Sequence, residues 1–160
     1  MRIGIGYDVH KLADERDLII GGVKIEYYRG LEGHSDADVL VHSIMDALLG
    51  AAGLRDIGFY FPPDDCKFKD ANSLELLCEV KEMIYERGFS IINIDSVIIA
   101  QEPKMKNYIP NMKDSISRSL GIDKERINVK ATTTEKLGYL GRGEGIAAQA
   151  VVLLEVKNEY

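Results

Sequence analysis

The chain has 160 residues and a mass of 17.8 kDa, the usual size of one domain around one core, so we expect residues 1–160 to form a single domain. Hydrophobic residues make up 46% of the chain and charged residues 29%, which excludes disordered, collagen-like and coiled-coil classes. The net charge of -6 argues against binding to nucleic acids or anionic membranes.

The sequence shows no clear membrane span, export signal or cysteine motif. The longest apolar run, residues 91–100, is too short and too polar to span a bilayer, and the first ten residues lack the apolar stretch of an export signal. Cys66 and Cys78 have no CxxC spacing, so we expect neither a disulfide framework nor a zinc ribbon. These features predict a soluble, cytoplasmic protein with reduced thiols.

The first half of the chain predicts a strand, a hairpin and a helix. Residues 2–9 alternate between apolar and small or polar residues, as in a strand with two different faces. Two short apolar runs, 18–20 and 23–27, flank Gly21-Gly22 and predict a small β-hairpin. Apolar residues at helical spacing begin at residue 39, after a polar segment rich in N-cap residues, and end at Gly53.

The second half alternates between helices and strands. Residues 55–69 have no period and predict a loop, after which Ser73 is expected to cap a helix that ends at Gly88. Strands are predicted over 90–100 and 127–131, with a helix over 108–120 between them. The last strand, 146–156, is almost continuously apolar and is therefore expected to be central in its sheet.

This order of elements predicts an α/β (α+β) fold with a mixed four-stranded sheet, helices on one face and a small β-hairpin arm. Three helices cannot cover both faces of a sheet rich in Ile and Val. We therefore expect the second face to be buried by copies of the same chain.

A possible metal site lies in the first quarter of the chain. Asp8 and His10 are two residues apart on a strand, so their side chains point the same way, and His42 on the first helix is a third candidate ligand. Two histidines, one aspartate and an open position are typical of catalytic zinc. Taken alone, the Asp-x-His triplet is explained more simply by a surface turn with a hydrogen-bonded histidine. The clustering of all three histidines, His10, His34 and His42, favours the metal.

Two later motifs allow a structural and a functional interpretation. Thr132 to Glu135 matches a Thr-x-x-Glu capping box, which predicts a helix start. The same residues at a helix N-terminus are suited to binding phosphate, with Glu135 as a ligand for Mg²⁺. Residues 141–145, GRGEG, form either a flexible turn or a phosphate contact through Arg142. Gly4-Ile5-Gly6 lacks the third glycine of a dinucleotide-binding fingerprint and lies within a strand.

Seven segments in a fixed order resemble one enzyme family almost from end to end. They are GYDVH (6–10), GHSDADVLVH (33–42), DALLGAAGLRDIG (46–58), FPPDD (61–65), IIAQEPKM (98–105), VKATTTEKLG (129–138) and GRGEGIAAQA (141–150). The chain is similar to the 2-C-methyl-D-erythritol 2,4-cyclodiphosphate synthase family of the non-mevalonate isoprenoid pathway. Tyr7 and Tyr139 depart from this pattern, since both stand where phenylalanine is common, and Lys106 stands where leucine is common.

The resemblance implies a phosphorus-oxygen lyase. Such an enzyme converts 4-diphosphocytidyl-2-C-methyl-D-erythritol 2-phosphate to the 2,4-cyclodiphosphate and releases CMP. The 2-phosphate attacks the β-phosphorus of the same molecule. Because the attacking phosphate is already an anion, the reaction needs positioning and charge neutralisation by two divalent ions more than a nucleophilic side chain.

The resemblance also implies the site residues. One zinc ion per subunit would be held by Asp8, His10 and His42, and Mg²⁺ or Mn²⁺ by Glu135. The residues expected to act in catalysis are His34, Thr133 and Glu135. The residues expected to bind the rest of the substrate are Asp8, His10, Ser35, Asp56, Ile57, Gly58, Phe61, Pro62, Pro63, Asp64, Asp65, Tyr139 and Arg142. The cytidine slot would consist of Ala100, Gln101, Glu102, Pro103, Lys104, Met105, Lys106, Ala131 and Thr132.

In this family the slot and the metal site of one active site come from neighbouring subunits of a homotrimer. The resemblance therefore implies a homotrimer, with a prenyl diphosphate as a ligand of its central channel near Arg142 and Glu144. Two other functions stay open at this point. One is a non-catalytic, metal-dependent trimeric binder of an isoprenoid or nucleotide diphosphate, and the other is a zinc hydrolase acting on phosphate esters.

Overall fold

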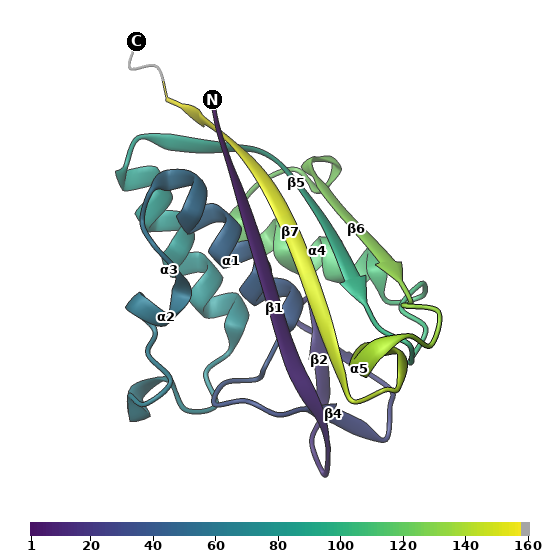
Figure 1. Ribbon diagram of the computed structural model, residues 1–160. Coiled ribbons are helices and arrows are strands. Elements are labelled where there is room, and N and C mark those ends of the chain that lie inside the picture. Colours follow the sequence, from purple (N-terminus) through teal and green to yellow (C-terminus); the bar gives the residue numbers. More distant parts are fainter. Residues whose placement is uncertain (158–160) are drawn as a thin grey trace.

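The computed structural model describes residues 1–157 and has two layers, a mixed sheet and a layer of helices behind it (Figure 1). The sheet has five strands in the order β4-β1-β7-β5-β6. Their bounds are β1 (Arg2–Asp14), β4 (Arg29–Leu31), β5 (Phe89–Ile99), β6 (Ile127–Thr132) and β7 (Gly145–Val156). The three long helices are α1 (Val39–Ala52), α3 (Ser73–Glu86) and α4 (Ile109–Leu120). The predicted fold class is confirmed.

The sheet differs from the prediction by one strand. The three-residue strand β4 pairs with the end of β1, through Leu12 opposite Leu31, and is too short to carry an alternating pattern. Strand β7 lies between β1 and β5, antiparallel to both, so its predicted central position is confirmed. Strands β5 and β6 are parallel, and α4 lies in the connection between them.

Helix α1 packs directly on β1 because of the two glycines at the start of the chain. A Cβ atom at Gly4 or Gly6 would collide with the carbonyl oxygens of Ala47 and Ser43, respectively. These glycines therefore permit close approach of helix and strand and do not bind a nucleotide. The close approach places His42 of α1 beside Asp8, in the middle of β1.

The predicted hairpin is confirmed as β2 (Leu18–Ile20) paired with β3 (Val23–Ile25). Its turn is tied to the start of α1, because the backbone N–H groups of Gly21 and Gly22 donate to the carboxylate of Asp38 at 2.9 and 2.7 Å. Asp38 is also the N-cap of α1 and accepts from the N–H of Val41 at 3.1 Å. Complete burial, together with the charge of Asp36, raises the pKa of Asp38 to about 6.

Three local predictions need correction. The loop at 55–69 contains one helical turn, α2 (Ile57–Tyr60), and a 3₁₀ turn, η1 (Cys66–Phe68). Asn72, not Ser73, caps α3 through a bond to the N–H of Leu74. No helix starts at the Thr-x-x-Glu motif: Glu135 has a positive φ of 53°, and the short helix α5 (Gly138–Gly141) begins after Leu137. The predicted helix start is therefore wrong, while the predicted roles of Thr133 and Glu135 do not depend on it. A second 3₁₀ turn, η2 (Lys124–Arg126), precedes β6.

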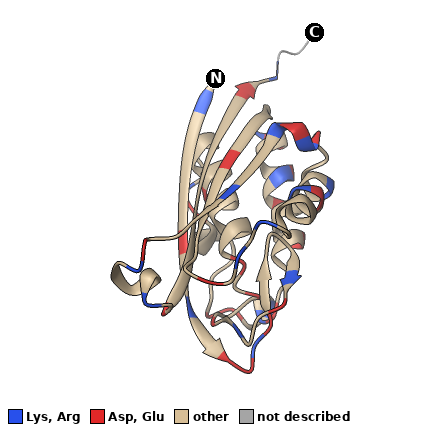
Figure 2. Ribbon diagram, turned by 90° about the vertical axis from the view of Figure 1, so that its right-hand side faces the viewer, with Lys and Arg blue, Asp and Glu red and all other residues tan. Residues whose placement is uncertain are grey.

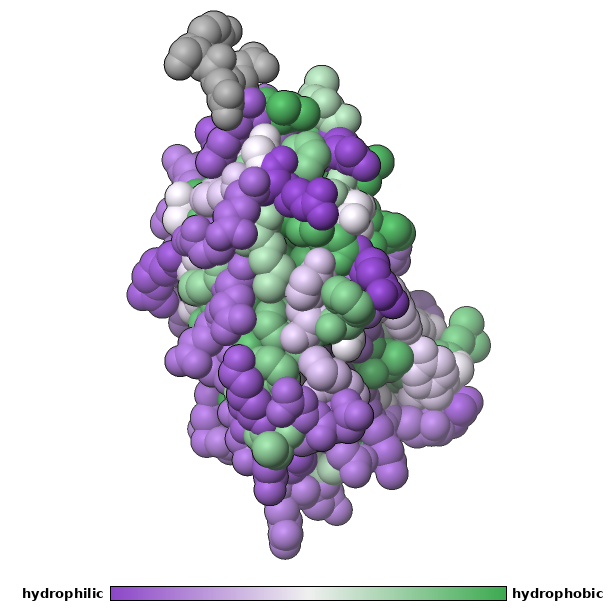
Figure 3. Space-filling model, turned by 90° about the vertical axis from the view of Figure 1, so that its left-hand side faces the viewer, coloured by the Kyte–Doolittle hydropathy of each residue, from purple (hydrophilic) through white to green (hydrophobic). Residues whose placement is uncertain are grey.

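One face of the sheet is uncovered, as predicted. Ile3 and Ile5 of β1 are 71% and 64% exposed, and Tyr7, Val9 and Val151 are also exposed on this face, which we call the open face. In Figure 1 the open face is turned toward the reader, and in Figure 3 hydrophobic side chains gather along the corresponding right-hand edge. Figure 2 shows α5 projecting from the sheet on this side. Within residues 1–157 no helix has the length and apolar character needed to cross a membrane.

Candidate metal centre and substrate site

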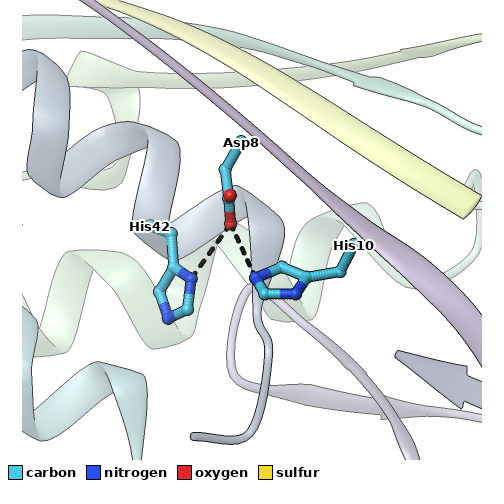
Figure 4. A group of neighbouring side chains, drawn as sticks. All are labelled: Asp8, His10 and His42. Atoms are coloured by element: carbon cyan, nitrogen blue, oxygen red, sulfur yellow. Dashed lines mark hydrogen bonds and ion pairs between the residues drawn. The ribbon is translucent and has the colours of Figure 1, made fainter. Parts of the chain in front are cut away.

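Asp8, His10 and His42 come together between β1 and α1 (Figure 4). The Oδ2 atom of Asp8 lies 3.2 Å from Nε2 of His10 and 3.0 Å from Nδ1 of His42. One possible ligand atom from each residue lies within 4.8 Å of the other two. The period of the strand places Asp8 and His10 on the same face, and the glycine contact with α1 brings His42 to them.

The hydrogen bond on the far side of His10 indicates which ring nitrogen is free to bind a metal. Its Nδ1 lies 2.7 Å from the carbonyl oxygen of Glu32. A carbonyl only accepts, so Nδ1 carries a proton, and Nε2, the nitrogen beside Asp8, is the one that a metal can take once it displaces any proton there. A carboxylate oxygen and an imidazole nitrogen directed at the same point fit a divalent cation of the zinc type.

The electrostatics of the triad also favour a cation. Burial alone would raise the pKa of Asp8, but its hydrogen bonds to His10 and His42 outweigh burial and hold the pKa well below the ordinary range. Burial lowers the pKa of His10, whereas the bond to Asp8 and its charge outweigh that effect and raise it. Asp8 therefore stays ionised at neutral pH and supplies a fixed negative charge.

A cavity of about 230 Å³ adjoins the triad. Its lining includes the three candidate ligands, the predicted catalytic residue His34 and these predicted substrate residues: Ser35, Ile57, Gly58, Phe61 and Pro63. Among the others, Asp56 caps α2 and Asp65 caps η1, while Pro62 and Asp64 lie in the same segment. The ring of His34 is fixed by a hydrogen bond, with its Nε2 atom 3.2 Å from the carbonyl oxygen of Asp65. Sequence reasoning missed Met45, Phe68 and Leu76, apolar lining residues that resemble any core residue in the sequence.

A second hollow, of about 380 Å³, lies at the ends of β5 and β6. It is lined by Ala100, Gln101, Pro103, Lys104, Met105, Lys106, Ala131, Thr132, Thr133 and Glu135. The structure thus brings together the predicted cytidine residues, apart from Glu102, with two predicted catalytic residues. The hydroxyl oxygen of Thr133 accepts from the N–H of Glu135 at 3.1 Å, and Gln101 Oε1 accepts from the N–H of Lys136 at 3.0 Å.

The two hollows do not meet within one chain. The strand register places Asp8, Ala148, Ile98 and Ala131 in one row across β1, β7, β5 and β6. Three strand spacings separate the ends of this row, about 14 Å. The side chains of Ala148 and Ile98 between them are buried. The two hollows of one chain therefore share no lining residue and have buried side chains between them.

Tyr139 and Arg142 line neither hollow. The hydroxyl of Tyr139 lies 3.0 Å from that of Tyr7 on the open face, and this bond is the main reason why the pKa of Tyr7 is raised to about 12. Arg142 pairs with Glu144 at 2.6 Å, in the turn predicted for residues 141–145. The two tyrosines that depart from the family pattern are therefore partners of each other.

The fold and the site define a mixed α/β protein with a candidate metal centre on the wall of a cavity. The model of the YgbB family matches residues 1–155. The 2-C-methyl-D-erythritol 2,4-cyclodiphosphate synthase of Clostridium perfringens is 59% identical over 96% of this chain and 99% of its own length. The chain belongs to the YgbB family, whose matching relatives are lyase-type enzymes of isoprenoid-precursor synthesis.

Two solved structures extend the likeness to three dimensions. The bifunctional IspDF of Campylobacter jejuni has a TM-score of 0.95 and 50% identity, over 98% of this chain and 42% of that one. The Plasmodium falciparum IspF in a CDP complex has a TM-score of 0.86 and 41% identity, over 98% of this chain and 97% of that one. Both likenesses therefore extend over almost the whole of this chain.

Proposed function

We propose that the chain converts 4-diphosphocytidyl-2-C-methyl-D-erythritol 2-phosphate to 2-C-methyl-D-erythritol 2,4-cyclodiphosphate and releases CMP. The observation that carries this proposal is the convergence of Asp8, His10 and His42 on a cavity that His34 and Ser35 also line. The names of the curated relatives support the same reaction.

In this proposal Asp8, His10 and His42 would hold Zn²⁺, and Glu135 would hold Mg²⁺ or Mn²⁺. Bound there, the ions neutralise the crowded phosphates and make the β-phosphorus more electrophilic. The donor set fits zinc, since it combines one carboxylate with two imidazoles and lies beside an open cavity. Glu135 is exposed and offers a carboxylate to an ion that keeps most of its other ligands from water and phosphate.

The side chains act by positioning. His34 and Thr133 contact the transferring phosphoryl group, while residues 56–58 and 61–65 hold the methylerythritol and its 2-phosphate. The apolar walls formed by Ile57, Phe61 and Phe68 limit the access of water, so the internal phosphate attacks in preference to a solvent molecule. An oxygen of the 2-phosphate forms a bond to the β-phosphorus, the bond from the β-phosphorus to the oxygen that bridges it to the α-phosphorus breaks, and CMP leaves with that oxygen.

We also propose a homotrimer in which the triad of one subunit faces the cytidine slot of its neighbour. The separation of the two hollows within one chain and the apolar open face support this assembly. Three open faces around one axis would enclose a channel, and Arg142 and Glu144 at its mouth are suited to a prenyl diphosphate. The cytidine slot selects cytosine through backbone groups of residues 100–104, which would leave acceptors unpaired with uracil.

The decisive test follows the substrate by ³¹P NMR, with and without a chelator and with zinc added back. We expect cyclic diphosphate and CMP, loss of both with the chelator, and recovery with zinc. Tight binding of substrate without CMP release would identify the non-catalytic binder instead. An open-chain product that carries ¹⁸O from labelled water would identify a zinc hydrolase. Either of these results would overturn the proposed reaction.

A further inference from the structure

A chain of hydrogen bonds lies behind His42, on the side of the ring away from Asp8. Nε2 of His42 lies 2.9 Å from the hydroxyl oxygen of Ser73, the first residue of α3. That hydroxyl is in turn bonded to Oδ1 of Asp36. Ser73 is fully buried and His42 is 7% exposed, so water does not compete for these bonds.

The direction of this chain of bonds follows from Asp36. Its Oδ2 accepts from the N–H of Ser73 at 2.9 Å, and its Oδ1 accepts from the N–H of Asp38 at 3.2 Å. Both oxygens thus act as acceptors, as an ionised carboxylate requires. The hydroxyl proton of Ser73 therefore points to Asp36, and the Ser73 oxygen presents a lone pair to His42. A lone pair at this position requires a proton on Nε2 of His42.

A second hydroxyl near His42 does not change this assignment. Ser35 Oγ lies 3.3 Å from Nε2 of His42, farther than Ser73. If Ser35 donated its proton to Nε2, the lone pairs of Nε2 and Ser73 would face each other at 2.9 Å in a buried place. That arrangement is repulsive, so both hydroxyls accept from His42 or only Ser73 does.

We propose that Ser73 and Asp36 are positioning residues that keep a proton on Nε2 of His42, so that Nδ1, beside Asp8, is the nitrogen that gives up its proton to bind zinc. This inference rests on the proposed role of the triad as a zinc site. It assigns to Ser73 and Asp36 the task that the Glu32 carbonyl performs for His10. The negative charge of Asp36, transmitted through the Ser73 hydroxyl, also makes the imidazole a more basic ligand.

The first test measures zinc affinity of the full-length protein by competition with a chromophoric chelator. Ser73→Ala removes the acceptor of the Nε2 proton, and we expect zinc binding to weaken about 10- to 100-fold. Asp36→Asn is nearly isosteric, but its amide group can donate to the Ser73 oxygen and turn the Ser73 proton toward His42. That reversal favours the wrong tautomer, so we expect a loss of similar size.

The matched control is Ser96→Ala. Ser96 is equally buried, at 2% exposure, and its hydroxyl donates to the Asn128 carbonyl at 2.8 Å, away from the triad. We expect its zinc affinity to stay within about two-fold of the wild type. If Ser73→Ala and Asp36→Asn behave like this control, the proposal is wrong.

A second measurement needs no variant. In the zinc-loaded wild type, ¹H–¹⁵N NMR of the imidazole rings should place the remaining proton of His42 on Nε2, with slow exchange because Ser73 and His42 are buried. A proton on Nδ1 would overturn the inference. Failure of the proposed reaction is seen separately, since it would leave zinc affinity and tautomer as expected but yield no cyclic product.

Discussion

The two hollows of this chain differ in how deeply their side chains are buried and in how firmly hydrogen bonds fix them. The candidate ligands at the triad are half-buried or buried, and both histidines have their far nitrogens fixed by partners. At the second hollow Thr132, Thr133 and Glu135 are exposed, and their bonds are to nearby parts of the same loops. The difference agrees with the proposed assembly, in which the metal half lies within one chain and a neighbouring chain covers the second hollow.

This contrast has a physical basis in where each half lies. The triad is held between a strand and a helix that pack closely through Gly6, so the positions of its side chains are determined by the core. The second hollow lies beyond the last residues of β5 and β6, where loops determine the geometry. Rigid elements are suited to metal ligands, and loops are suited to a substrate that has to enter and leave.

The largest effect is expected from removing a ligand of the metal half. His42→Ala should lower turnover about a thousand-fold or more, because a metal supplies several kcal/mol of transition-state stabilisation. Zinc content by mass spectrometry should fall with it, while the far-ultraviolet circular dichroism stays that of the wild type. Full zinc content with normal turnover would remove the triad from the mechanism.

Mixing two inactive variants tests whether the halves come from different subunits. Ala131→Trp fills the second hollow at an exposed position, so it should inactivate the enzyme without disturbing the core. In a random trimer formed with His42→Ala, about one interface in four combines two intact halves, so about a quarter of wild-type activity should return. The control is each variant refolded alone, and it should remain inactive. Absence of recovery in mixed trimers verified by native mass spectrometry would place both halves in one chain.

Glu135→Gln tests the role of the carboxylate charge at the second hollow separately from the size of the side chain. The variant keeps the size of the side chain and the backbone bond to Thr133, but it loses the charge that attracts Mg²⁺. We expect turnover at ordinary Mg²⁺ to fall about 10- to 100-fold, with partial rescue at high Mg²⁺ or Mn²⁺. Glu79→Gln, at an exposed position of α3, is the matched control and should behave as the wild type. Equal activity of the two variants would exclude a metal at Glu135.

Much of the metal half could be predicted from the sequence, because it depends on local patterns. Strand alternation places Asp8 beside His10, and the helical spacing after residue 38 places His42 on the first helix. The glycine pair that brings helix and strand together was visible too, although its role became clear only from the packing. Ser73 was read as a helix cap, since the sequence does not reveal that Asn72 takes that place and leaves its hydroxyl for His42.

The second hollow could be predicted less well, because its backbone is irregular. Glu135 and Lys136 have φ values of 53° and 64°, a region that non-glycine residues seldom adopt and that their residue types do not predict. The same motif would cap a helix if the chain turned differently. Strand β4 was missed because three residues that only extend the edge of a sheet carry no period of their own.

The smallest expected effect is on the stability of the contact between the hairpin and α1, which supports the metal half. This effect depends on pH. Asp38 accepts from three backbone N–H groups that join the hairpin to α1, and Asn at this position would turn a donor amide toward one of them. We expect Asp38→Asn to lower the free energy of unfolding by about 1 to 3 kcal/mol, measured in urea at neutral pH. A free energy equal to that of the wild type would mean that the three bonds contribute nothing net.

The pH dependence of wild-type stability provides the finer measurement. Because folding raises the pKa of Asp38 from 3.8 to about 6, the folded chain binds this proton more tightly than the unfolded chain does. The contribution of Asp38 is therefore most favourable at low pH and is lost as the pH rises from about 4 to about 6. Asp38→Asn has no such proton, so the difference in unfolding free energy between the variant and the wild type should shrink across this window. A constant difference would show that Asp38 is ionised throughout, and that its backbone donors offset the cost of burying its charge.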